Sequence, residues 1–199
     1  MLMKLKHTVA AAVLAAPFLA CAPASATLMI GAPATGGNYI PFGSIAGYPE
    51  YQQVYASSDF SRTVKIDDIE FYTFSGTGNP NTGVIKITLS TTSKPVNGLS
   101  TNLSQNIGSD VETVYDAKLQ AVQSGVLDIQ LSTPFTYNPA DGNLLVDLVE
   151  SSPYTGGPSF EFNGASNGVF SRGFSGQTIP VVNNSGLVTG FSTVPEPST

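Results

Sequence analysis

Apolar and polar residues alternate along most of this chain, in short segments that end at clusters of turn-forming residues. Ile85, Ile87 and Leu89 alternate with polar residues, and a similar segment begins at Leu127. A period of two places every second side chain on the same face, as in a β-strand with one face buried. Clusters such as GTGNPNTG, YNPADGN and SSPYTGGP separate the segments and contain the residues that tight turns need. The pattern therefore predicts an all-β fold.

About nine to eleven short strands are expected, packed face to face as a β-sandwich, of which the jelly roll is one form. They are expected at 27–30, 51–56, 64–74, 85–89, 111–119, 127–131, 144–149, 160–162, 169–170 and 187–191. The apolar phase changes at Asp67 and Asp68, which predicts a β-bulge. In 111–119 the odd-numbered residues, from Val111 to Leu119, are expected to share one face. Segment 144–149 is apolar on both faces, as a central strand is, and a helical turn or two is expected within 99–107.

The first 26 residues have the three parts of a secretory signal peptide. Lys4 and Lys6 make the start basic, an Ala-rich apolar run follows, and Ala24-Ser25-Ala26 forms an A-x-A cleavage site. The apolar run is short for a membrane span. We expect cleavage after Ala26, so that Thr27 becomes the first residue of the mature protein.

Cys21 allows a second interpretation, because bacterial lipoproteins are cut just before a cysteine that is then acylated. Phe18 and Leu19 fit the residues that precede such a cysteine poorly, so cleavage after Ala26 is the prediction that we retain. The 173 residues from Thr27 onward suffice for one domain. We place a single β-sandwich domain at 27–192 and a disordered tail at 193–199.

Beyond residue 26 the chain contains no His and no Cys, because His7 and Cys21 are the only ones. Ser-His-Asp and Cys-His catalysis are thereby excluded, as are zinc and copper sites built from nitrogen and sulfur ligands. Lys4 and Lys6 leave with the signal peptide, so that six basic and fourteen acidic residues remain and the net charge is −8. Such a charge disfavours nucleic acid and anionic membrane surfaces as partners.

Several segments resemble those of exported bacterial PEP-CTERM proteins. They are YQQVYASSDFS (51–61), LSTTSKPVNGLSTNLSQNIGSD (89–110) and STPFTYNPADGNLLVDL (132–148). The ending VPEPST resembles the start of the sorting signal of that family, with Pro195, Glu196 and Pro197 at the place of the signature tripeptide. In the family an apolar membrane helix and an Arg cluster follow the tripeptide, and neither follows here. The mature chain as given is therefore expected to have no stable membrane span.

The resemblance implies processing by an exosortase-type protease. It also implies export from a Gram-negative bacterium to the cell envelope or the extracellular matrix. The N-terminal segment agrees with it, since that family pairs a signal peptide with this tail. The resemblance implies little about activity, because the sorting signal is attached to many different domains.

Paired carboxylates are the catalytic chemistry that this composition still permits, since a glycosidase needs two of them about 5–10 Å apart. Ten acidic residues could supply a pair: Asp67, Asp68, Glu70, Asp110, Glu112, Asp116, Asp128, Asp147, Glu150 and Glu161. Most of them occupy the polar phase of alternating strands, where carboxylates that face solvent are expected. Catalysis is therefore the alternative and not the main prediction.

Calcium and sugar are two ligands that the residues of the expected loops could bind. GTGNPNTG (76–83) and NPADGN (138–143) offer oxygen ligands for calcium, but neither has EF-hand spacing, and turn formation explains the same residues. No cofactor is therefore predicted, with calcium kept as an alternative. Sugars stack on exposed aromatic rings, and five tyrosines lie in or beside expected loops. Tyrosine at the end of a strand also commonly packs its ring in the protein while its hydroxyl contacts solvent. The five are Tyr48, Tyr51, Tyr55, Tyr137 and Tyr154.

The sequence thus predicts a non-enzymatic, secreted or surface-associated β-sandwich of the extracellular matrix or biofilm. Adhesion through polar loops is the expected mechanism, with exopolysaccharide as the candidate ligand. The alternative is a glycan-processing enzyme that uses a pair of carboxylates.

Overall fold

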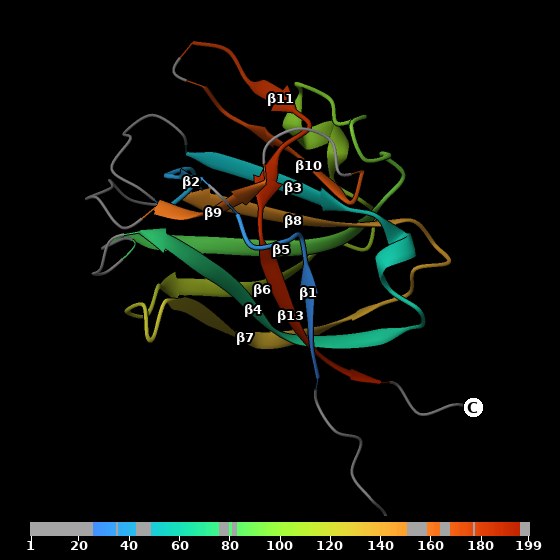
Figure 1. Ribbon diagram of the computed structural model, residues 1–199. Coiled ribbons are helices and arrows are strands. Elements are labelled where there is room, and N and C mark those ends of the chain that lie inside the picture. The colour runs from blue at the N-terminus through green and yellow to red at the C-terminus, as the bar shows by residue number, and fades with distance from the viewer. Residues whose placement is uncertain are drawn as a thin grey trace, which may run out of the picture.

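Two antiparallel β-sheets packed face to face make up the described part of the protein (Figure 1). The computed structural model describes residues 26–34, 36–42, 49–75, 80, 83–150, 159–163, 168–176 and 178–195. Two 3-10 turns, η1 (Ser57–Asp59) and η2 (Leu103–Asn106), are the helical elements of these residues. The all-β prediction is confirmed. No helix of these residues has the length and apolarity needed to cross a membrane.

Thirteen strands occur in the described residues, which exceeds the expected number because three of them have two or three residues. The first sheet contains β1 (Ala26–Ile30), β2 (Gly37–Asn38), β4 (Val64–Ser75), β7 (Val126–Tyr137), β9 (Ser159–Asn163), β12 (Gly186–Leu187) and β13 (Thr189–Pro195). The second sheet contains β3 (Glu50–Tyr55), β5 (Val84–Thr92), β6 (Glu112–Lys118), β8 (Asn143–Glu150), β10 (Phe170–Phe174) and β11 (Val181–Asn183).

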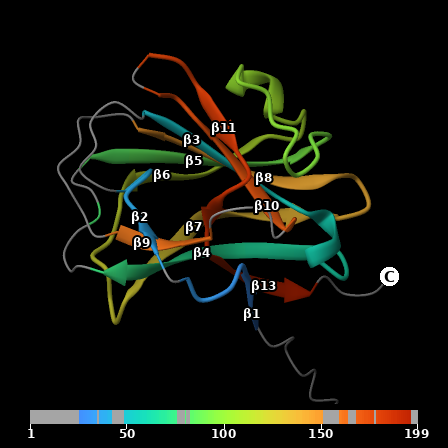
Figure 2. The ribbon, with the colours of Figure 1, turned by 45° about the horizontal axis from the view of Figure 1, so that its top comes forward.

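Strand β4 organises the first sheet because it pairs with β7 along one side and with β13 and then β9 along the other. The second sheet has the order β11-β10-β3-β8-β5-β6, so β8 is a central strand, as its two apolar faces predicted. The turned view in Figure 2 shows the two sheets as separate layers. Long-range pairing therefore dominates both sheets.

The core between the sheets is rich in aromatic rings. Tyr55 of β3 lies 5.0 Å, centroid to centroid, from Phe191 of β13, in an edge-to-face arrangement that aromatic pairs favour. Phe42 lies 5.0 Å from both Phe71 and Phe160. These four phenylalanines and Tyr55 are no more than 1% exposed. The rings therefore join strands of both sheets into one core.

The predicted bulge in β4 is confirmed. The pairing of β4 with β7 changes register between Ile66 and Asp68. The extra residue allows Ile66 and Ile69 both to be buried although they are out of phase, and both are fully buried. As a result Asp68 and Glu70 lie on the outer face of the first sheet.

The phase predicted for 111–119 is wrong in most of its length. Val114 is fully buried, whereas Val111 is 44% exposed and Thr113 and Ala117 are exposed as well. The pairing of β5 with β6 skips Val114, since Ile87 pairs with Tyr115 and Thr88 with Thr113. This irregularity reverses the faces partway along the strand.

A loop that carries η2 covers part of the outer face of the second sheet. Leu99 from this loop packs on Val54 and Leu145, which form a small second core. Asn106 is fully buried and its Nδ2 donates to Oε1 of Gln52 at 2.8 Å. The outer face of the first sheet has no such cover among the described residues, and it is the more open of the two.

Strand β13 continues through Thr193 and Val194 to Pro195, three residues beyond the expected end of the domain at 192. A second register shift, between Ser192 and Thr193, keeps these residues paired with β4. Thr193 Oγ1 also donates to the carbonyl oxygen of Ala26 at 3.3 Å. The predicted tail residues 196–199 lie outside the described residues.

Candidate functional site

The outer face of the first sheet concentrates carboxylates, an amide and aromatic rings. Alternation along each strand places on it Asp68, Glu70, Tyr72 and Phe74 of β4, Asp128 and Gln130 of β7, Glu161 of β9, Ser192 of β13, and Thr27 and Met29 of β1. Figure 1 shows β13 and β1 lying side by side on this sheet. We call this set the outer face.

Asp68 is the most unusual residue of the outer face. It is 4% exposed, its Oδ2 accepts a short hydrogen bond from Gln130, and its Oδ1 is buried with no hydrogen-bond partner. Burial, and then the hydrogen bond and the charge of Asp128, raise the pKa of the Asp68 carboxyl to about 8. With this pKa the Asp68 carboxyl is mostly protonated at neutral pH, and the Gln130 amide, which also donates to Asp128 Oδ1 at 3.0 Å, holds the two carboxyl groups side by side.

Tyr72 and Glu70 form the middle of the outer face. The Tyr72 hydroxyl donates to Glu70 Oε2 at 2.6 Å, and the pKa of Tyr72 is raised by burial and then by this bond. Gly190 of β13 makes room for the pair, since a Cβ there would lie 2.5 Å from Tyr72 Oη and 3.0 Å from Glu70 Oε2. The ring thus extends over the neighbouring strand.

Substitution of Gly190 by alanine is expected to displace the Tyr72 hydroxyl and to break its bond with Glu70. Both groups are ends of side chains that can move, so the free energy of unfolding should fall by only about 1 kcal/mol, the value of one hydrogen bond. Urea denaturation measures this. Gly36→Ala is the matched control, because no heavy atom lies within 4 Å of a Cβ at Gly36. Equal stability of the two variants would contradict the packing described here.

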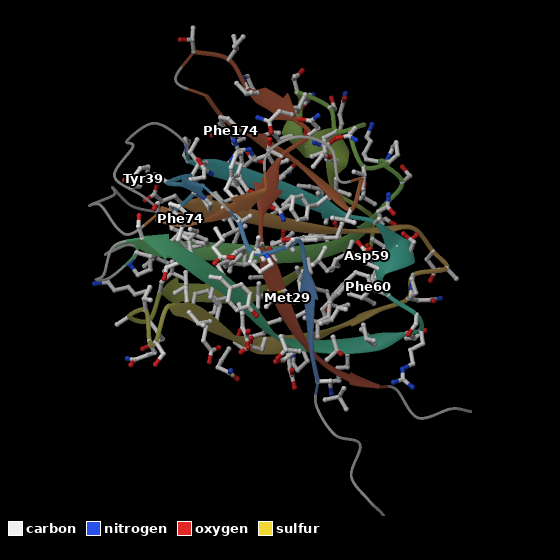
Figure 3. All side chains as sticks on the ribbon, viewed as in Figure 1. Met29, Tyr39, Asp59, Phe60, Phe74 and Phe174 are labelled. Atoms are coloured by element: carbon white, nitrogen blue, oxygen red, sulfur yellow. The ribbon has the colours of Figure 1, made fainter. Side chains whose placement is uncertain are left out.

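Two exposed aromatic side chains lie at the end of the outer face near β2 and β9. Phe74 is 44% exposed and Tyr39 is 47% exposed, and Figure 3 shows both at the same end of the molecule. Phe74 lies against Gly37, where a Cβ would be 2.7 Å from its Cδ1. Met29 of β1 is 48% exposed as well. Apolar surface is therefore available beside the carboxylates.

Of the ten acidic residues singled out in the sequence, four come together on the outer face: Asp68, Glu70, Asp128 and Glu161. The pKa of Tyr72 is raised by the charges of Glu70, Asp68 and Glu161, as expected when carboxylates lie on the same face as the hydroxyl. Asp147 is also buried, but on the second sheet, where its Oδ2 accepts from Thr88 Oγ1 at 3.4 Å. Burial raises its pKa.

Three of the five tyrosines considered for sugar stacking are not accessible to a sugar. Tyr51, Tyr55 and Tyr137 are fully buried, and each hydroxyl hydrogen-bonds within the protein. Packing is therefore their role, while Tyr48 and Tyr154 lie outside the described residues. Tyr72 on the outer face and Tyr39 just after β2 are more accessible, and their sequence neighbours gave no signal that would distinguish them.

The turn at 138–143 is explained by its own hydrogen bonds. Asn138 Oδ1 accepts from the amide of Ala140 at 3.2 Å, and Asn138 Nδ2 donates to Asp141 Oδ2 at 2.8 Å. Most of 76–83 lies outside the described residues. Within the part of the chain that the structure describes, no group of three or more His, Cys, Asp or Glu side chains could hold a metal ion. Nothing in these contacts favours calcium over turn formation.

Among the cavities between described residues are two whose described lining does not include two carboxylates. The larger, of about 240 Å³, lies beside β10 and β11 and has no carboxylate among its described lining residues. The smaller, of about 170 Å³, is lined by Asp59, Phe60 and Ala26 among others. Burial raises the pKa of Asp59. Figure 3 marks Asp59 and Phe60 close to β1.

The residues of the predicted processing sites lie near one another. Ala26 and Thr27, which flank the expected signal-peptide cleavage, are the first two residues of β1 and are exposed. They pair with Thr193 and Ser192 of β13. Pro195 of the sorting motif ends β13, whereas Glu196 and Pro197 lie outside the described residues. Both predicted processing sites are thus at the same edge of the first sheet.

Comparison with known proteins gives no relative from which a function could be transferred. No protein-family model, no curated protein and no solved structure matches this chain. The class defined by the fold is an all-β sandwich, and its function has to be inferred from its own surfaces.

Proposed function

We propose that this protein is a non-enzymatic, exported component of the bacterial surface or extracellular matrix that binds polysaccharide through its outer face. The observation that carries this proposal is the half-exposed ring of Phe74 on the same face as carboxylates and the amide of Gln130, with the exposed Tyr39 at the same end of the molecule. Aromatic rings stack on the apolar faces of sugars, and carboxylates and amides accept and donate hydrogen bonds to hydroxyls.

The form of the face suits an extended polymer. Strands β4 and β13 are paired on both sides over most of their length, and β7 is paired with β4 along one side, so the side chains on them have fixed spacing. The carboxylates Glu70, Asp128 and Glu161 make the face acidic, which favours a neutral polymer on this face over an anionic one. Adhesion would then involve this sheet in addition to the polar loops expected from the sequence.

Removal of the two rings should weaken this binding. We expect the double variant Phe74→Ala, Tyr39→Ala to lose at least tenfold in affinity for a neutral polysaccharide, because each stacked ring contributes about 1 kcal/mol or more. Native-gel retardation by hydroxyethyl cellulose, xylan and alginate measures this. Ile179→Ala is the matched control, since Ile179 is 69% exposed and follows β10 in the second sheet. Failure of all three polymers to retard the wild-type protein would refute the proposal.

Export and sorting are part of the same proposal. The N-terminal segment and the VPEPST ending support a route through the inner membrane, with an exosortase-type protease as a processing partner. N-terminal sequencing of the secreted protein should find Thr27 as its first residue. Secreted protein that still begins at Met1 would refute the predicted cleavage of the signal peptide.

The proposed matrix role has its own test. Deletion of the gene should reduce the cohesion of biofilms.

Glycan hydrolysis is the second candidate, and the raised pKa of Asp68 beside Asp128 favours it. Perturbed carboxyl groups of this kind often occur in active sites. However, these two are within hydrogen-bonding reach of each other, whereas glycosidase carboxylates are about 5–10 Å apart. We therefore expect no new reducing ends when the protein is incubated with polysaccharide. Release that disappears in Asp128→Asn would establish the enzyme instead.

A further inference from the structure

Asp59 has a carboxylate oxygen that lacks a partner. The residue ends the 3-10 turn η1, between β3 and β4, and is partly buried. Its Oδ2 is buried and has no hydrogen-bond partner among the described residues. Burial raises the pKa of this carboxyl. An unpaired buried carboxylate oxygen costs free energy, so this position favours a hydrogen-bond donor that carries a positive charge.

Asp59 and the start of β1 line the same cavity. The cavity of about 170 Å³ has Asp59 on its wall together with Ala26 and Leu28 of β1 and Thr193 of β13. Ala26 and Leu28 lie on the same face of β1, because side chains alternate along a strand, and Leu28 packs against the core. Figure 3 shows Asp59 close to β1. The carboxylate and the first residue of the strand therefore adjoin one small space.

The other polar groups near Asp59 do not neutralise it. Arg62 also lines the cavity, but it is exposed, and burial acts on the pKa of Asp59 with no positive charge opposing it. The pKa of Tyr137 is raised by burial and then by the charge of Asp59, so this phenol is near. However, the Tyr137 hydroxyl donates to the carbonyl oxygen of Gly142 at 2.6 Å. Within the part of the chain that the structure describes, no cation lowers the pKa of Asp59.

Cleavage after Ala26 creates a positive charge at this place. The Thr27 nitrogen is bonded to the carbonyl carbon of Ala26, so it lies at the edge of the cavity that Ala26 lines. In the uncleaved chain this nitrogen belongs to a neutral amide. After cleavage it is an α-ammonium group, which is charged below a pKa of about 7.7–8.0. The pairing of Thr27–Ile30 with β13 still holds the new terminus in position.

We propose that the α-ammonium group of Thr27, formed by the predicted cleavage, binds the Asp59 carboxylate across this cavity. The inference rests on the export part of the proposed function, because an uncleaved chain has no such group. The contact joins β1, at the edge of the first sheet, to the turn that precedes β4. Removal of the signal peptide thereby stabilises this edge, and the precursor lacks the contact.

Acetylation of the terminal amine tests this contact. The acetyl group removes the charge but replaces the carbonyl oxygen of Ala26, which accepts from Thr193 Oγ1. Protein that begins at Thr27 is prepared with a free and with an acetylated terminus, and urea denaturation is followed at about pH 6.5, where an α-amino group is charged. We expect acetylation to lower the folding equilibrium constant about threefold or more, as for a partly exposed ion pair.

Two variants show whether Asp59 is the partner. In Asp59→Asn, which keeps the shape of the side chain, acetylation should change the folding equilibrium constant by less than about 1.5-fold. Asp116→Asn, at an exposed position of β6, is the matched control and should respond to acetylation as the wild-type protein does. Arg62→Met should also keep the response, because Arg62 is not the partner of Asp59.

Titration of the terminal amine in the wild-type protein needs no variant. A neighbouring carboxylate favours the charged form of an amine. The pKa of the Thr27 α-amino group, followed by NMR at its Cα, should therefore lie above the ordinary value of about 7.7–8.0. This measurement decides the matter even if Asp59→Asn fails to fold.

Four results would overturn the proposal. They are equal stability of the free and acetylated wild-type proteins, an equal loss on acetylation in Asp59→Asn, loss of the response in Arg62→Met, or an ordinary pKa for the Thr27 amine. All of them concern protein that does begin at Thr27, so they refute the ammonium contact alone. Secreted protein that begins at another residue would refute the predicted cleavage instead, and polysaccharide binding by the outer face is measured separately.

Discussion

Replacement of Gln53 by leucine is expected to lower the free energy of unfolding by about 3 kcal/mol, although leucine is the more apolar residue. Gln53 lies on β3 of the second sheet and is 1% exposed. Its Nε2 donates to the carbonyl oxygen of Leu187 at 2.9 Å, and its Oε1 accepts from the Leu187 amide at 2.8 Å and from the Tyr51 hydroxyl. The substitution leaves a buried amide and a buried hydroxyl without partners, and each costs about 1–3 kcal/mol.

This side chain acts as a polar connection between the sheets. Because β12 is only two residues long, its pairing with β9 is brief, and Gln53 supplies hydrogen bonds that a longer strand would provide. Denaturation in guanidinium chloride measures the loss. Gln120→Leu, at an exposed position, is the control and should change stability by less than about 0.5 kcal/mol. If the Gln53 variant were as stable as this control, the connection would have no energetic role.

Stability is expected to fall as the pH rises from about 4 to about 8, and Asp68 should account for much of the slope. The pKa of Asp68 is about 8 in the folded protein, whereas an unfolded aspartate has a pKa of about 3.9. Between these values the folded state holds a proton that the unfolded state has lost, so raising the pH favours unfolding. One pKa unit corresponds to about 1.36 kcal/mol of folding free energy. Even half of the pKa shift of Asp68 would lower the free energy of unfolding by roughly 3 kcal/mol between these pH values.

Asp68→Asn is the decisive variant because the amide stays neutral at every pH and can still donate to Asp128. At pH 8 it should be more stable than the wild-type protein, and at pH 4 the two should be similar. Part of the slope should remain, since burial also raises the pKa values of Glu50, Asp59 and Asp147. Asp116→Asn, at an exposed position of β6, is the control and should leave the slope unchanged. A wild-type slope in Asp68→Asn would show that the Asp68 carboxyl is ionised in the folded protein.

The alternation of apolar and polar residues was sufficient to predict the all-β sandwich, because most strands bury one face and expose the other. The β4 bulge could also be predicted, since Ile66 and Ile69 cannot face the core together in a regular strand. Which residues of 111–119 face the core could not be predicted, because Val111 and Val114 are both apolar but lie in opposite phases of a strand. Pairing with β5 decided between them by skipping Val114.

The candidate site was less predictable than the fold. Asp68 and Asp128 are sixty residues apart in the sequence, and each looks like a solvent-facing carboxylate of an alternating strand. Their coupling arises from the register of β4 with β7, which places Asp68 opposite Gln130 and Glu70 opposite Asp128. The burial of Tyr51 likewise depends on which face of β3 is turned to the other sheet. The neighbours and exposure of these side chains are set by the pairing of strands that are distant in the sequence, so the sequence pattern of one strand could not predict them.

Mapping of a bound oligosaccharide onto the mature protein tests the central claim most directly. Backbone amide shifts in NMR would be followed during titration with a hexasaccharide of the polymer that retards the protein most strongly. We predict the largest changes at Glu70, Tyr72, Phe74 and Asp128 on the outer face, with the amides of β5 and β8 unaffected. Shifts confined to the second sheet, or none at saturating ligand, would contradict the assignment of the outer face as the glycan-binding surface.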